Sequence, residues 1–119
     1  MIIELIIEII ASKEMYLARY YLEREKWIPA INRFKVVINQ YDRTIYVEEA
    51  LHRLVEAYLS LGLVNEAQTA GAILGYNYKS TDWYDRTFEL LSSKGLQPKS
   101  SGNSWLNQIY RQVVKGQWL

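Results

Sequence analysis

The stretch YYLEREKWIPAINRF, residues 20–34, decides the fold because its large and small apolar residues follow a helical spacing. Tyr21 lies near the end of one apolar-periodic segment, Trp27 precedes the next, and Ala30 and Phe34 follow at steps of three and four residues. Such steps place side chains on one face of a helix. Pro29 suits the first turn of the second helix, where its missing N–H group costs nothing. The stretch therefore predicts two helices joined by a tight turn.

Helical periodicity continues along the rest of the chain. No segment of four or more residues between turn signals alternates with period two, so we expect no strand. The predicted fold is all-α, with about six helices near residues 2–25, 28–40, 44–61, 64–75, 81–91 and 104–119. Side-chain oxygens at helix starts and glycines at helix ends predict the boundaries. The candidate start residues are Asp42 or Thr44 and Ser80 or Thr81, and the candidate end residues are Gly62 and Gly75.

The chain repeats itself. Laying Tyr21 on Tyr58 also aligns Trp27 with Val64 and Ala30 with Ala67. A helical pair of roughly 34 residues, with a small residue at the helix crossing and a large aromatic near the end of the first helix, is typical of tetratricopeptide repeats. We therefore expect Tyr21, Trp27, Ala30 and Phe34 in the core. Gly71 stands where the first repeat has Phe34, so the fifth helix is expected to pack tightly there.

This pattern predicts three regions. Residues 1–92 form two tetratricopeptide-like repeats plus a packing helix. Residues 93–103 are rich in Ser, Gly, Lys and Pro and are expected to be a flexible linker. Residues 104–119 form an amphipathic helix whose apolar stripe lies opposite basic and amide side chains. Such a helix can fold back on the repeats, enter a partner's groove or lie on an anionic membrane.

Composition excludes several classes of function. Fourteen Lys and Arg balance thirteen Asp and Glu, so no nucleic-acid partner is expected. The chain has no cysteine, which excludes disulfides and thiolate metal sites. The opening MIIELIIEII carries two glutamates and fits neither a signal peptide nor a membrane span. Its isoleucines surround the helix, so we expect a covering neighbour: earlier repeats of a longer solenoid, or a second copy in a homodimer through residues 2–10.

Two segments carry a resemblance to a known family. KEMYLARYYLEREKWIPAINRFKVVINQY and VEEALHRLVEAYLSLGLVNEAQTAGAILGYNY resemble the last two repeats of the BamD (ComL) family, above all its alphaproteobacterial members. The resemblance covers about residues 12–90, and its most specific pieces are RYY, AINRF, EALHRLVEAYLSLG and LGYNY. BamD proteins are tetratricopeptide lipoproteins of the machine that assembles outer-membrane β-barrels. The lipidated cysteine and the earlier repeats of that family are absent from this chain.

The resemblance implies a non-catalytic adaptor at the periplasmic face of the outer membrane, with no cofactor. In the family, the C-terminal repeats dock on the last periplasmic POTRA domain of the barrel component BamA, and other assembly subunits join them. An Asn-Arg pair on the second helix of the penultimate repeat matches Asn32 and Arg33. A guanidinium there can hold a partner carboxylate through two parallel hydrogen bonds. The expected partner-binding residues are Asn32, Arg33, Val36 and Gln40.

Two alternatives belong to other classes. An unrelated tetratricopeptide adaptor would bind a peptide or helix in its concave groove, for which the candidate wall residues are Met15, Arg19, Glu49, His52 and Glu56. A small helical enzyme or metal site could instead use His52 with Glu48 and Glu56, which lie four residues to either side on one helical face. That second pattern is weak, because one histidine and two carboxylates on successive turns converge poorly.

Overall fold

The computed structural model describes residues 1–78 and 81–99 and contains five α-helices in these ranges. They are α1 (Ile2–Glu23), α2 (Trp27–Gln40), α3 (Val47–Ser60), α4 (Val64–Tyr78) and α5 (Asp82–Ser93). No strand occurs among the described residues, and the all-α prediction is confirmed. The predicted sixth helix, residues 104–119, lies outside the described residues.

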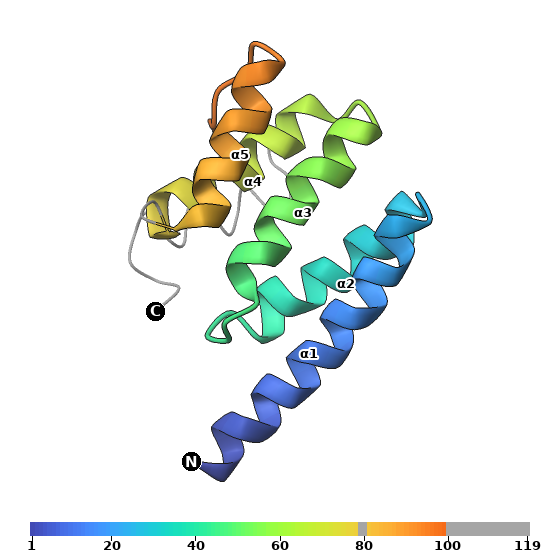
Figure 1. Cartoon of the computed structure of the whole chain (residues 1–119), viewed down its shortest axis with the longest axis vertical. Coiled ribbons are helices and arrows are strands. Elements are labelled where there is room, and N and C mark those ends of the chain that lie inside the picture. The colour runs from blue at the N-terminus through green and yellow to red at the C-terminus, as the bar shows by residue number, and fades with distance from the viewer. Residues whose placement is uncertain (79–80, 100–119) are drawn as a thin grey trace.

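The helices pack as successive neighbours. α1 packs against α2, α2 against α3 and α3 against α4, while α5 packs against both α3 and α4 (Figure 1). The pairs α1–α2 and α3–α4 correspond to the two predicted repeats. A contiguous core runs through both pairs, and its largest fully buried side chains include Phe34, Met15, Ile38, Leu51 and Leu54. This arrangement is the tetratricopeptide-like fold that the repeat pattern predicts.

The residues of the opening stretch occupy the interior as expected. Ala30 and Phe34 are fully buried, and Tyr21 and Trp27 are half-buried against the same core. Lys26 N donates to Tyr21 O at 2.9 Å and closes the turn between the two helices. The spacing therefore reflects packing between α1 and α2.

Helix boundaries differ from the sequence prediction at two places. Thr44 does not cap α3; its hydroxyl donates to Tyr41 O at 2.7 Å, just after α2, and α3 begins only at Val47. Gly75 does not end α4, which continues to Tyr78. A Cβ atom at Gly75 would lie 2.6 Å from the Tyr84 ring, so this glycine allows α5 to approach α4. Thr81 caps α5 as predicted, accepting from Tyr84 N at 3.3 Å.

Residues 94–99, expected to belong to a flexible linker, run along α4. The Gln68 side chain donates to Gln97 O at 2.9 Å, and Lys99 N donates to Gln68 O at 3.1 Å. Leu96 is partly buried against the core. This part of the predicted linker is therefore attached to the repeats, because Gln68 satisfies its backbone groups.

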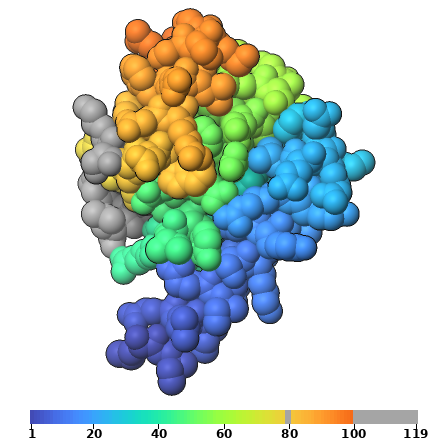
Figure 2. Space-filling view, viewed as in Figure 1, coloured from blue at the N-terminus to red at the C-terminus, as the bar shows by residue number. Residues whose placement is uncertain are grey.

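The outer side of α1 is apolar and exposed. Its N-terminal part stands out from the rest of the molecule in the space-filling view (Figure 2). None of the described helices combines the length and the apolar character needed to cross a bilayer.

Candidate functional site: the outer face of α2 and the α1–α3–α5 face

The outer face of α2 carries the residues expected to bind a partner. α2 buries Ala30, Phe34 and Val37 in the core. Helical geometry turns the intervening positions outward. Asn32 and Gln40 are exposed, and Arg33 and Val36 are half-exposed beside them. The four residues therefore lie together along one accessible side of α2.

Arg33 is held at the edge of α2 by an ion pair with α1. Its Nη1 donates to Glu14 Oε2 at 3.0 Å, and the two side chains are 36% and 24% exposed. A guanidinium carries five N–H donors, of which this bond uses one. The ion pair orients the arginine and leaves donors for a second acceptor. The sequence did not predict Glu14 as its partner, because the two residues lie on different helices.

A second group of charged residues joins α1 to α3. Arg19 Nε and Nη2 donate to the two carboxylate oxygens of Glu49, at 2.8 and 2.5 Å. Arg53 lies 3.4 Å from Glu49 and donates to Glu56 Oε1 at 2.9 Å. These four residues, Arg19, Glu49, Arg53 and Glu56, form a charge network that pairs every member with another.

Burial and pairing act in opposite directions on Glu49. Desolvation by itself raises the carboxyl pKa, but the hydrogen bond and charge of Arg19, with those of Arg53, outweigh it and lower the pKa of Glu49 below its usual value. The same hydrogen bond raises the pKa of Arg19. The carboxylate is therefore held ionised as part of the link between α1 and α3.

Three of the expected groove residues lie in the interior, and one of them is Glu49 of the charge network, which is 8% exposed. Met15 is fully buried, one turn from Ala11 and Ala18 on the side of α1 that faces the core. His52 is 5% exposed, and its Nδ1 lies 2.7 Å from the Thr87 hydroxyl on α5. These side chains hold the repeats together and are covered by the chain itself. Arg19 and Glu56 remain half-exposed on the groove side.

The side chains of Glu48, His52 and Glu56, which the sequence offers as a weak candidate site, do not converge at one point. His52 Nε2 lies 3.7 Å from Glu56 Oε2, whereas Glu48 lines a separate cavity with Tyr78. Within residues 1–78 and 81–99, no group of three His, Cys, Asp or Glu side chains is placed to hold a metal ion.

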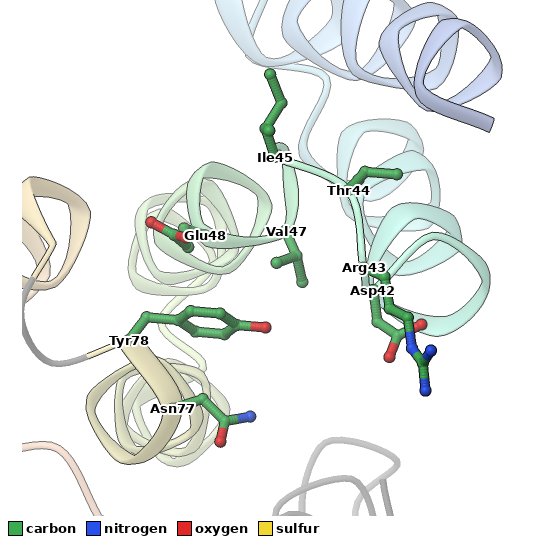
Figure 3. Close-up of a pocket in the computed structure, with 8 residues that line it drawn as sticks. All are labelled: Asp42, Arg43, Thr44, Ile45, Val47, Glu48, Asn77 and Tyr78. Atoms are coloured by element: carbon green, nitrogen blue, oxygen red, sulfur yellow. The ribbon is translucent and has the colours of Figure 1, made fainter. Parts of the chain in front are cut away.

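The cavity beside Glu48 was not predicted from sequence. It measures about 370 Å³ and lies between the α2–α3 connection and the end of α4 (Figure 3). Asp42 and Glu48 contribute carboxylates, and burial together with these two charges raises the pKa of Tyr78. Arg43 lines the same cavity, so its wall carries charges of both signs. The cavity forms where residues 42–48 meet Asn77 and Tyr78 of α4, a contact that no local motif reveals.

Comparison with known proteins shows what this chain is similar to. The sequence model of the family described as "YfiO: Outer membrane lipoprotein" matches residues 1–73. The chain is 45% identical over 96 residues to the outer membrane protein assembly factor BamD of Caulobacter vibrioides, covering 81% of this chain and 32% of that protein. It is 43% identical over 91 residues to BamD of Rickettsia prowazekii, covering 76% of this chain and 36% of that protein.

The similarity is confined to part of these relatives. The chain spans about a third of the length of the two curated relatives that it matches at this identity. No solved structure matched it. The matched family segment includes all of α1, α2 and α3, and with them Asn32 and Arg33.

Proposed function

This chain belongs to the BamD family of outer-membrane protein assembly factors, and from that premise we propose that it is a non-catalytic scaffold docking on a POTRA domain of the barrel-assembly component. The proposed docking surface is the outer face of α2, made by Asn32, Arg33, Val36 and Gln40. The proposed location is the periplasmic face of the outer membrane, where the full-length protein would be lipid-anchored. Further assembly subunits would bind elsewhere on the repeats.

The observation that carries this proposal is the placement of Arg33. Its side chain is 36% exposed and oriented by Glu14, so it needs little reordering to meet a partner carboxylate. Asn32 supplies an amide beside it, and Val36 supplies a half-exposed apolar contact one turn along. A charged centre with amide and apolar neighbours is a combination that interfaces use for specificity.

Docking of this kind would be sensitive to salt. A partner carboxylate would approach Arg33 beside the existing Glu14 pair and share the guanidinium donors. Such charge-assisted hydrogen bonds are shorter and stronger than neutral ones, and the planar fork fixes their direction. Arginine is therefore expected to contribute orientation as well as attraction.

The test is calorimetric binding of the chain to the membrane-proximal POTRA domain of the same organism at two salt concentrations. We expect salt-weakened binding, and we expect Arg33→Ala to weaken it by roughly 10- to 100-fold, the loss of one or two charged hydrogen bonds. Arg33→Lys should recover only part of the loss, because lysine keeps the charge without the fork.

Two further variants distinguish docking from a structural role. Arg86→Ala removes an exposed arginine from α5, which packs on α3 and α4, and should leave binding unchanged. Glu14→Gln keeps Arg33 but removes the carboxylate that orients it, and should weaken binding less than Arg33→Ala does. If Arg33→Ala binds as tightly as the parent, or if Glu14→Gln loses as much affinity as Arg33→Ala, the docking site is not Arg33.

The groove alternative makes a different prediction. A peptide bound along α1, α3 and α5 would contact Arg19 and Glu56, so substituting either would weaken binding while Arg33→Ala would not. The charge network already pairs these residues within the chain. A peptide charge would have to displace an existing partner, and this cost favours the α2 surface.

A further inference from the structure

A groove runs between α3 and α5, which pack directly against each other (Figure 1). Two hollows make it up. The larger measures about 420 Å³ and is bounded on the α5 side by Arg86, Glu89, Leu90 and Ser93. The smaller measures about 210 Å³ and is bounded on that side by Leu90 and Lys94. Because Leu90 lines both hollows, they form one continuous surface, the α3–α5 groove.

An aromatic ring orients Arg86 in this groove. The guanidinium carbon lies 4.6 Å from the centroid of the Trp83 ring, and Trp83 is partly buried against the core. Stacking on a ring face leaves the N–H edge of a guanidinium free to donate. Within residues 1–78 and 81–99, Arg86 has no hydrogen bond or ion pair. It therefore presents an oriented, unpaired cation to the groove.

The other charges that line the groove define what could bind beside Arg86. Arg53, on the α3 side, already donates to Glu56 at 2.9 Å. Lys94 is exposed in the smaller hollow and has no ion-pair partner in the part of the chain that the structure describes. Glu89 lies between the two unpaired cations and would repel a continuous run of acidic residues. The groove is therefore complementary to two separated carboxylates.

The spacing along α5 indicates how those carboxylates would be arranged. Arg86, Leu90 and Lys94 follow at steps of four residues along α5 and its C-cap. The helical rise separates the two cations by about 12 Å and places the leucine halfway. An extended peptide rises about 3.3 Å per residue and turns every second side chain to the same face. Its residues i, i+2 and i+4 would span about 13 Å and match the three positions.

A helical partner fits this groove less well. Helices that pack directly have axes about 8–10 Å apart, whereas a helix with its side chains is about 10–12 Å across. The groove between α3 and α5 is therefore too narrow to receive a whole helix. Single side chains of an extended segment can enter the two hollows.

We propose that the α3–α5 groove binds an extended peptide segment of a partner protein with the pattern acidic–x–apolar–x–acidic. One carboxylate accepts hydrogen bonds from Arg86, and the other lies beside Lys94. The apolar side chain packs between them against Leu90 and Leu59. This site lies apart from the α2 docking surface and does not depend on the proposed function, and its test contains no POTRA domain.

An NMR titration of the labelled full chain tests the proposal with a synthetic peptide of sequence Gly-Ser-Asp-Ser-Leu-Ser-Asp-Ser-Gly, blocked at both ends. The blocked ends leave only side-chain carboxylates. At low salt, we expect the largest chemical-shift changes at Arg86, Leu90 and Lys94. A control peptide of the same composition, Gly-Ser-Asp-Leu-Ser-Ser-Asp-Ser-Gly, points its leucine away from the two carboxylates. It should bind roughly 5- to 10-fold more weakly, because the leucine stays in water.

Arg86→Ala should weaken binding of the first peptide by roughly 10-fold, the loss of one charged hydrogen-bonding partner. The matched control is Arg24→Ala, which removes an arginine stacked 3.6 Å from the centroid of the Tyr20 ring on α1, outside the groove. This control should bind as the parent does, and circular dichroism should show both variants helical. Parental affinity in Arg86→Ala, equal affinity of the two peptides, or no change in the groove at millimolar peptide would each overturn the proposal.

Discussion

At the scale of single residues, the ion pairs determine which arginine can still bind a partner. Arg19 donates two hydrogen bonds to Glu49, whereas Arg33 donates one to Glu14. Residue type and helical spacing could place each arginine outside the core but could not find its carboxylate. That pairing depends on how far one helix is offset along the other, which periodicity within one helix does not determine.

The Arg19–Glu49 pair predicts a pH-dependent stability. The folded pKa of Glu49 lies below its unfolded value of about 4.5, so its contribution is present above that pH and is lost as the pH falls through the folded pKa. Glu49→Gln should lower the free energy of unfolding near neutral pH by about 1–3 kcal/mol. Urea unfolding of parent and variant at several pH values measures the difference. A difference that stayed constant below pH ~4 would contradict the role of the Glu49 charge.

The burial of His52 could not be predicted from the sequence. Its place on helix α3 was predicted, but its burial against Thr87 requires α5 to pack there. Thr87→Val should lower the free energy of unfolding by about 1–3 kcal/mol, because the imidazole Nδ1 loses its partner inside the protein. Ser92→Ala, at an exposed position of α5, is the matched control and should have little effect. Thermal unfolding by circular dichroism compares the two variants, and equal midpoints would show that the bond contributes nothing.

At the scale of helices, small residues determine where α5 packs. A Cβ at Gly71 would lie 2.9 Å from Leu91 Cδ1 and 3.3 Å from Thr87 Cγ2. The repeat alignment predicted tight packing at Gly71 because a glycine replaces the large residue of the first repeat. Met15 shows the opposite case: it is buried and not in the groove, because its spacing from Ala11 and Ala18 is that of a buried stripe.

The close approach at Gly71 gives a prediction for α5. Gly71→Leu should lower the stability of the chain by about 1–3 kcal/mol or more, because the side chain overpacks the α4–α5 contact. Hydrogen exchange should show the largest loss of protection in α5, with α1 and α2 much less affected. Uniform loss of protection in all helices would show instead that the chain unfolds as one unit, without a weaker α5.

At the scale of the whole molecule, two repeats and a further helix present separate surfaces. Internal repetition was enough to predict the fold class, the helix pairs and the core positions Ala30 and Phe34. The cavity at Tyr78 and the charge network could not be predicted, because each joins residues from different helices. The outer face of α2 stays accessible beside them and is the surface proposed for the POTRA domain.

The most direct measurement of the central claim is a chemical-shift map of the labelled chain titrated with the membrane-proximal POTRA domain. Docking through α2 predicts that the largest changes occur at the amides of Asn32, Arg33 and Val36 and at the Arg33 side chain. Residues on the groove side, such as Arg53 and Glu56, should change little. The largest changes along α1, α3 and α5 on the groove side, or no changes at saturating POTRA domain, would contradict docking through α2.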